Sequence, residues 1–169
     1  MKTAHVYILL GGLAGGDPSR AVNEGMDFLA GQLKVIPGVK VTSYPWADYE
    51  RIVVEHPNKA DDELVVIGYS GGGWKATVLA NEHSGLLINL MVLYDPSPAW
   101  SMRPISHNVV RAICYHNTNP MFGNLGGGRL SGPPGIVETI DIAEEHLFVQ
   151  NDQSLHAHTV AAVKALLVS

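Results

Sequence analysis

The sequence predicts an α/β fold, a three-layer sandwich in which helices cover both faces of a parallel sheet of about six strands. Short apolar runs alternate along the chain with longer amphipathic segments, as strands alternate with crossover helices. The apolar runs are hydrophobic throughout, which indicates strands that are buried on both faces. The length of 169 residues fits one domain, and neither an internal repeat nor a linker divides it. We therefore expect a single domain over residues 1–169.

Each predicted element has a local reason in the sequence. Strands are expected where β-prone apolar runs end at glycine, proline or polar residues, as HVYILL does before Gly11. Helices are expected where apolar residues recur every three or four positions, as they do after Asp17-Pro18-Ser19. In chain order, the expected strands are residues 5–10, 39–43, 63–68, 88–94, 109–116 and 137–141. The expected helices are residues 17–33, 48–56, 72–83 and 155–167.

Composition and charge narrow the class of protein. Hydrophobic residues make up 46% of the chain and charged residues 16%, which is typical of a compact domain. A net charge of −5 gives no reason to expect nucleic acid or an anionic membrane as a partner. The single Cys114 lies in an apolar run, so we expect a buried thiol and no internal disulfide. The apolar run at residues 6–10 is short for a signal peptide, and no segment is long enough to span a bilayer, so a soluble cytoplasmic protein is expected.

The clearest motif is G-x-S-x-G at residues 68–72, with Ser70 at its centre. It follows a predicted strand directly and opens a predicted helix, which is the arrangement of a nucleophile elbow. The glycines have a physical purpose, because the turn is too sharp for larger side chains on either side of the serine. The alternative is a glycine-rich turn in which the serine is incidental. The predicted strand before the motif and the predicted helix after it favour Ser70 as a nucleophile.

A serine nucleophile needs a base and an acid that orients the base. In this kind of fold the chain order is serine, then acid, then histidine. Asp95 follows the strand after the elbow helix, and no other Asp or Glu occurs before Glu138, so we predict Asp95 as the acid. The alternative for Asp95 is a turn-forming role before Pro96.

The base must come from a loop after the last strand. His146 lies five residues beyond the predicted strand 137–141 and precedes the closing helix, so we predict it as the base. His156, near the start of that helix, is the rival. For the oxyanion hole, we expect backbone N–H groups from Gly71 and from Gly12 or Leu13 in the loop after the first strand.

Taken together, these residues resemble the α/β-hydrolase superfamily over essentially the whole chain, and especially its small, lidless lipase-like and thioesterase-like serine hydrolases. The stretches LLGGLAG, VVIGYSGGG, VLYDPSP and EEHLF…LHAHTV look like the oxyanion strand, elbow, acid strand and histidine loop of that group. The resemblance implies strand order 2-1-3-4-5-6 without the antiparallel hairpin of larger members. It also implies a carboxylic ester or thioester as a small-molecule substrate, with no cofactor and no metal.

The sequence departs from the family in three places. Many members carry the acid one strand later, where this chain has Asn117-Thr118-Asn119. Gly11-Gly12 stands in place of the common His-Gly pair of the oxyanion loop. No cap domain is present, so the pocket is expected to come from Tyr69 and from two long loops. The candidate lining residues in those loops are Trp100, Met102, Met121, Phe122 and Leu125; loop packing is the alternative for them.

Three other interpretations fit the sequence less well. A non-catalytic α/β domain that binds a partner or small molecule is disfavoured by the ordered Ser, Asp and His. A nucleotide-binding domain is disfavoured because the glycines after the first strand lack the G-x-G-x-x-G spacing and Ser43, not an acid, ends the second strand. A zinc site at His156 and His158 is disfavoured because residues two apart on a helix point in different directions.

Overall fold

The computed structural model describes residues 2–12, 23–56, 61–98, 101–118 and 126–168. Six parallel strands form one sheet in the order β2-β1-β3-β4-β5-β6, which confirms the predicted class and strand order. The strands are β1 (Thr3–Leu10), β2 (Val39–Pro45), β3 (Asp62–Tyr69), β4 (Leu90–Tyr94), β5 (Ala112–Asn117) and β6 (Val137–Ile142). The α-helices are α1 (Glu24–Lys34), α2 (Arg51–Glu55), α3 (Gly71–Glu82), α4 (His146–Val149) and α5 (Gln153–Leu166).

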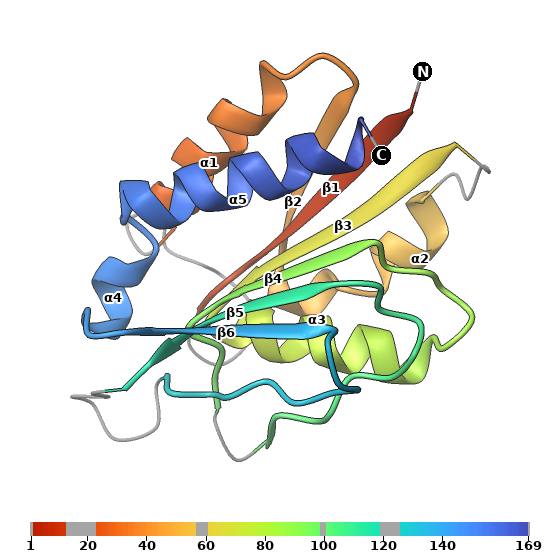
Figure 1. Cartoon of the computed structure of the whole chain (residues 1–169). Helices are drawn as coiled ribbons and strands as arrows, with labels where there is room; N and C mark the ends of the chain where they lie inside the picture. Colours follow the sequence, from red (N-terminus) through yellow and green to blue (C-terminus); the bar gives the residue numbers. More distant parts are fainter. Residues whose placement is uncertain (1, 13–22, 57–60, 99–100, 119–125, 169) are drawn as a thin grey trace.

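Helices cover both faces of the sheet, as Figure 1 shows, with α1 and α5 on one side and α2 and α3 on the other. Each face has its own hydrophobic core. Alternate side chains of the central strand β3 enter the two cores: Val65 and Ile67 pack with α1 and α5, whereas Leu64 and Val66 pack with α2 and α3. Burial on both faces explains why this strand is apolar without a polar alternation.

The predicted elements differ from the observed ones mainly at their ends. Residues 46–48 form a short 3₁₀ helix before α2, so the predicted helix 48–56 is divided. Ile88 and Val109 form only an isolated bridge, and β4 and β5 therefore start later than predicted. The beginning of the predicted helix 17–33 lies outside the described residues. Residues 146–149, predicted as a loop, form the short helix α4.

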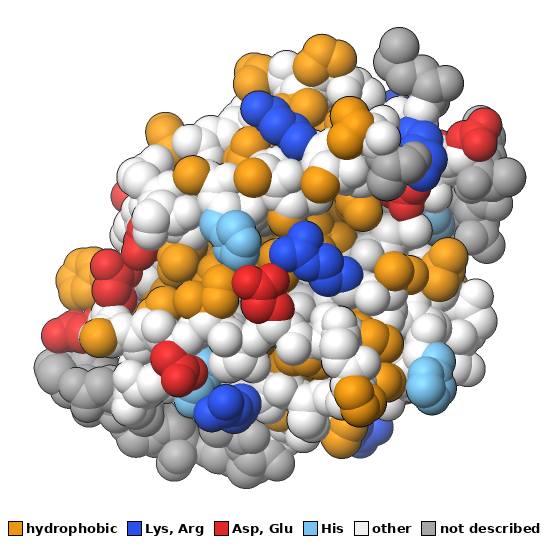
Figure 2. All heavy atoms as spheres, in the orientation of Figure 1, with side chains coloured by type: hydrophobic (Ala, Val, Ile, Leu, Met, Phe, Trp, Pro, Cys, Tyr) orange, Lys and Arg blue, Asp and Glu red, His pale blue; other side chains and the backbone are white. Residues whose placement is uncertain are grey.

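Edge strand β6 is only partly buried and carries two exposed carboxylates, those of Glu138 and Asp141. Glu138 on this strand pairs with Arg111 at 2.9 Å, and such charges oppose pairing with a strand of another molecule. Figure 2 shows acidic, basic and hydrophobic side chains interspersed over the face that carries α5 and β6. No helix in the described part of the chain is long and apolar enough to cross a membrane.

Candidate active site

Ser70 occupies the sharp turn between β3 and α3. Its backbone φ of 54° lies in the left-handed region, which is unfavourable for any residue other than glycine. The neighbouring glycines make the turn possible: a Cβ on Gly68 would lie 2.5 Å from the Gly72 carbonyl oxygen, and one on Gly72 would lie 2.0 Å from that of Leu9. The local structure is therefore the strand–turn–helix arrangement that the G-x-S-x-G motif predicts.

The side chains of Ser70, His146 and Asp95 lie within hydrogen-bonding distance of one another in a chain. Nε2 of His146 is 2.9 Å from Ser70 Oγ, and its Nδ1 is 2.6 Å from Asp95 Oδ2. Asp95 is completely buried, and His146 is 7% exposed. Because an ionised carboxylate only accepts hydrogen bonds, Nδ1 carries a proton and Nε2 is left to accept the proton of the Ser70 hydroxyl. The arrangement can therefore deprotonate Ser70.

Asp95 is held in place from several directions directly after β4. Its backbone N–H donates to the Tyr115 carbonyl oxygen at 2.9 Å, and its Oδ1 accepts from the Gly127 N–H at 2.6 Å. Among the described residues, Ser70 and Asp95 are the only ones other than glycine with a positive backbone φ, and the value at Asp95 is 41°. Strained backbone of this kind persists where surrounding contacts enforce it, and it is concentrated at functional sites.

A glycine-rich segment closes over the Asp95–His146 pair. A Cβ on Gly126 would lie 2.1 Å from Asp95 Oδ2 and 2.5 Å from His146 Nδ1, so no other residue fits at this position without displacing the pair. The Gly127 N–H bonds to Asp95, and the next N–H, that of Gly128, donates to the Pro96 carbonyl oxygen at 2.9 Å. The segment excludes solvent from the carboxylate and fixes it toward the histidine.

Tyr69 is buried and contacts His146. We expect Tyr69 to line the substrate pocket from the sequence, but its side chain points into the core on the α1–α5 face and has no exposed area. Its hydroxyl donates to the His146 carbonyl oxygen at 3.0 Å, and the two rings stack with centroids 5.4 Å apart. Burial raises the pKa of this phenol far above its ordinary value, so it remains a donor.

His156 lies away from the nucleophile, inside the helical layer. Its Nε2 is 2.7 Å from the Gln150 carbonyl oxygen, and its ring packs against Phe28 and Tyr94. Burial lowers the pKa of this histidine. The neighbouring His158 bonds instead to the Tyr115 hydroxyl at 3.1 Å. Of the two histidines weighed as the base, only His146 reaches Ser70.

The loop after β1 borders the nucleophile. A Cβ on Gly11 would lie 3.0 Å from the Cβ of Ser70, so the backbone there passes directly beside the serine. Asn23 fixes this backbone, since its side-chain amide bonds to both the N–H and the carbonyl of Gly11 at 3.0 and 3.1 Å. Gly12 follows directly, Leu13 lies outside the described residues, and Gly71 begins α3. Gly11, which directly precedes the expected donor Gly12, thus lies beside Ser70, and the expected donor Gly71 is the residue that follows Ser70 in the chain.

Trp46 adds an aromatic wall that the sequence did not lead us to expect. It follows β2, and its indole Cδ1 lies 3.5 Å from where a Cβ on Gly71 would be. The ring centroids of Trp46 and Trp74 lie 6.1 Å apart, and the ammonium group of Lys75 lies 4.6 Å from the centroid of Trp74. Parallel strands bring their carboxyl ends to one edge, so a tryptophan after β2 could have been assigned to this edge from the predicted topology.

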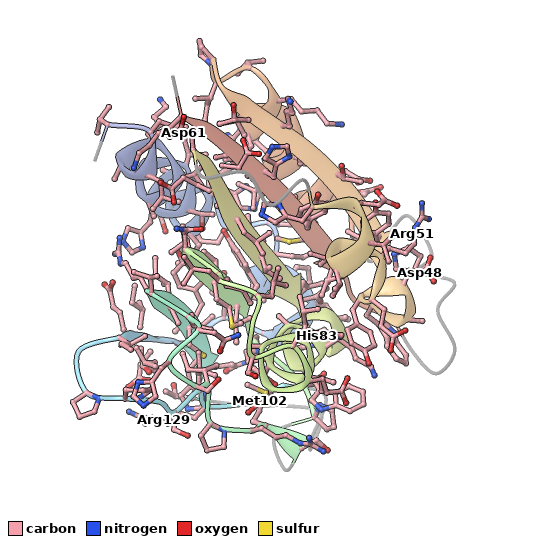
Figure 3. The ribbon with its side chains drawn as sticks, turned by 90° about the vertical axis from the view of Figure 1, so that its right-hand side faces the viewer. Asp48, Arg51, Asp61, His83, Met102 and Arg129 are labelled. Carbon is pink, nitrogen blue, oxygen red and sulfur yellow. The ribbon has the colours of Figure 1, made fainter. Side chains whose placement is uncertain are left out.

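The loop residues predicted to line a pocket have different outcomes. Met102 packs, partly buried, against the core on the α2–α3 face, and Figure 3 shows it beside α3. Its Cγ would lie 3.0 Å from a Cβ on Gly128, so it buttresses the glycine segment. The other predicted lining residues lie outside the described residues: Trp100, Met121, Phe122 and Leu125. Within the described ranges, no group of three or more His, Cys, Asp or Glu side chains is placed to hold a metal ion.

No protein-family model and no curated protein sequence matches this chain. Solved structures with low sequence identity do match it along nearly its full length. A putative hydrolase from Agrobacterium vitis S4 is 13% identical, with a TM-score of 0.64, over 98% of this chain and 88% of its own. Mouse α/β-hydrolase domain-containing protein 10 is 8% identical, with a TM-score of 0.61, over 96% and 89%. The fold of this chain is thus that of the α/β-hydrolases.

The similar structures also include human thioesterase 2, which is 7% identical with a TM-score of 0.57 over 99% of both chains. An esterase from Pyrobaculum calidifontis is 13% identical, with the same TM-score, over 99% of this chain and 78% of its own. At these identities the likeness concerns the fold alone, and the chemistry of this chain has to be argued from its own residues.

Proposed function

We propose that this protein is a serine hydrolase that cleaves a carboxylic ester or thioester through an acyl-enzyme on Ser70. The observation that carries the proposal is the hydrogen-bonded chain from Ser70 Oγ through both nitrogens of His146 to the buried Asp95 carboxylate. A serine with no catalytic role would not require a buried carboxylate, with strained backbone, at the end of two successive hydrogen bonds. Three groups in this order perform nucleophilic catalysis in unrelated folds, so the geometry supports the role without appeal to the fold.

In the first half-reaction, Nε2 of His146 takes the Ser70 proton as Oγ attacks the substrate carbonyl carbon. Asp95 holds the imidazole in the required tautomer and stabilises the imidazolium that forms. The carbonyl oxygen becomes an oxyanion, for which the N–H of Gly71 and that of Gly12 or Leu13 are the proposed donors. His146 then passes its proton to the departing alcohol or thiol, and the acyl group remains on Ser70 as an ester.

In the second half-reaction, water replaces the leaving group. His146 accepts a proton from the water molecule as its oxygen attacks the acyl carbon, and the same oxyanion donors stabilise the second tetrahedral intermediate. Collapse of this intermediate breaks the bond to Ser70 Oγ, which recovers its proton from His146. The products are a carboxylic acid and the free enzyme. No step needs a metal or a cofactor.

Esters and thioesters fit this chemistry because both join an electrophilic carbonyl carbon to an oxygen or sulfur atom that can leave once His146 protonates it. The names of the similar structures, an esterase and a thioesterase among them, point to the same substrate class. We propose Trp100, Met121 and Phe122 as acyl-pocket residues from the sequence, and Trp46 from its position over Gly71. Aromatic and methionine side chains of this kind favour an apolar acyl group.

The test is turnover of p-nitrophenyl esters and acyl thioesters of increasing chain length by the wild type and by Ser70→Ala. We expect the wild type to hydrolyse part of the series and the variant to show no turnover above background, because the nucleophile is missing. Rapid acid quenching and intact-mass measurement should find the wild type heavier by one acyl group. Equal turnover by the two proteins would contradict the proposal.

A further inference from the structure

A second hydroxyl, that of Ser97, lies at the nucleophile. Its Oγ is 3.0 Å from Ser70 Oγ, and its side chain is almost completely buried, with the residue 8% exposed. The backbone joins the same two residues, because the Ser97 N–H donates to the Ser70 carbonyl oxygen at 3.0 Å. Two hydrogen bonds therefore connect Ser97 to Ser70, one through the main chain and one through the side chains.

Ser97 and Asp95 belong to one short segment after β4 that is held rigidly. The Pro96 carbonyl oxygen accepts from the Gly128 N–H, and Pro96 itself packs against Gly73 of α3, where an added Cβ would lie 2.7 Å from its ring. Asp95 bonds to His146, and Ser97, two residues later, bonds to Ser70. The segment thus contacts the base with one side chain and the nucleophile with the other.

The direction of the Ser97–Ser70 hydrogen bond follows from the protons available. Ser70 has one hydroxyl proton, and in the state ready for reaction it donates this proton to Nε2 of His146. Ser70 Oγ can then only accept from Ser97, so the Ser97 hydroxyl is the donor. One lone pair of Ser70 Oγ accepts this bond, and the other remains for attack on a carbonyl carbon.

We propose that Ser97 is a positioning residue for Ser70: its hydroxyl donates to Ser70 Oγ, fixes the side chain toward His146 and stabilises the negative charge that develops on Oγ as its proton leaves. The inference rests on the proposed function of Ser70 as nucleophile. A donor aimed at an atom that gains charge favours the charged form, and it is most effective where water is excluded. Ser97 transfers no proton and forms no covalent bond.

The experiment compares wild type, Ser97→Ala, Ser97→Thr and Ser43→Ala. Ser43 is an exposed serine of β2 and provides the matched control. We would measure the second-order rate constant for reaction with a fluorophosphonate, the kcat and KM for the best ester, and the melting temperature. Ser97→Ala should react about 3- to 10-fold more slowly, the range that one hydrogen bond supports. Its decrease should lie in kcat with KM little changed.

The conservative variant separates positioning from packing. Threonine keeps the hydroxyl and adds a methyl group, so Ser97→Thr should recover most of the rate if donation to Ser70 matters. Alanine removes only the oxygen, so a pure packing role would make threonine the worse variant and would move melting temperature and rate together. Wild-type rates in Ser97→Ala, or a lower rate in Ser97→Thr than in Ser97→Ala, would overturn the inference.

The same measurements distinguish this inference from the proposed function. A reactive wild type with an unaffected Ser97→Ala variant would overturn the role of Ser97 and leave Ser70 as the nucleophile. A wild type that neither reacts with the fluorophosphonate nor hydrolyses esters would overturn the proposed function, and the role of Ser97 with it.

Discussion

Asp95 combines two features that a turn-forming aspartate does not need. Its carboxylate is completely buried, and its backbone adopts a positive φ. Each of its oxygens has a hydrogen-bond partner, since Oδ1 accepts from Gly127 and Oδ2 lies at the His146 ring. The cost of the strained backbone is offset by these contacts, which aim the carboxylate at the base.

Asp95→Asn tests this acid directly. The uncharged amide cannot stabilise the imidazolium as a carboxylate does. When its oxygen keeps the bond from the Gly127 N–H, its NH2 group faces Nδ1 of His146, which must then accept, so the histidine loses its required tautomer. We expect kcat to fall by a factor of about 10³ to 10⁴, as loss of the charge does in comparable triads. Ester hydrolysis provides the measurement, and Asp141→Asn, at an exposed carboxylate on β6, is the control. Wild-type kcat in Asp95→Asn would assign the acid elsewhere.

The residues of this site differ in how far the sequence could identify them. Ser70 and Asp95 could be identified from the sequence because glycines flank the serine and a predicted strand ends just before the aspartate. The sequence gives no sign of a role for Ser97, although it stands in the same DPS segment, because that role depends on a distance between two loops. Gly126 leaves room for two side chains from other segments, and the Asn23 side chain bonds to the Gly11 backbone. Local sequence patterns do not encode such contacts.

At the level of the elements, α4 and α5 place one histidine in the site and the other in the core. His146 begins α4, where the Tyr69 hydroxyl bonds to its carbonyl oxygen. His156 follows the N-cap Asp152 of α5, whose side chain accepts from two backbone N–H groups of the first turn. Four residues in α4 are too few to show helical periodicity, which is why the sequence indicated a loop there.

His156 should make the stability of the protein depend on pH. Burial lowers the pKa of His156 in the folded protein below its ordinary value, so the unfolded chain binds the proton more readily. By linkage, the contribution of His156 to the free energy of unfolding is greatest above about pH 6.5, the ordinary histidine value, and falls as the pH drops below it. We expect denaturant unfolding at pH 7.5 and pH 5.5 to show a smaller loss of stability on acidification in His156→Gln than in the wild type.

His107→Gln, at an exposed position, is the matched control for that comparison. His56 is buried as well, and burial together with His5 lowers its pKa, so part of the acid sensitivity should remain in His156→Gln. An equal loss of stability in His156→Gln and wild type would show that His156 does not contribute. His156→Gln should keep much of the hydrolytic activity, because His156 does not contact Ser70.

Over the whole molecule, the residues that stabilise the fold and the residues of the candidate site occupy different parts of the sheet. Two hydrophobic cores lie on its faces, and the candidate site is gathered at the carboxyl ends of the strands, with Ser70 after β3, Asp95 after β4 and His146 after β6. Ligand sites of open parallel sheets occur at this edge. The sequence could predict this plan because burial on two faces and the alternation of elements are properties of the chain as a whole.

Leu33→Ala tests whether a core residue can be changed without affecting the candidate site. Leu33 is fully buried in the core between α1, α5 and the sheet, near the end of α1 that leads away from the site. We expect the variant to lose about 2 to 5 kcal/mol in the free energy of unfolding, from lost burial and the cavity left behind. Ester kcat at a temperature where it is folded should change little. Val35→Ala, at a position 80% exposed, should stay within about 0.5 kcal/mol of the wild type.

The role of Ser70 as the nucleophile is tested most directly by covalent labelling with a fluorophosphonate, followed by proteolysis and mass spectrometry. The geometry around His146 predicts a single phosphonyl adduct on the peptide that contains Ser70, and no adduct in Ser70→Ala or, at the same exposure, in His146→Ala. An unlabelled wild type, under conditions in which a control serine hydrolase reacts, would contradict the account, and so would an adduct on any other residue.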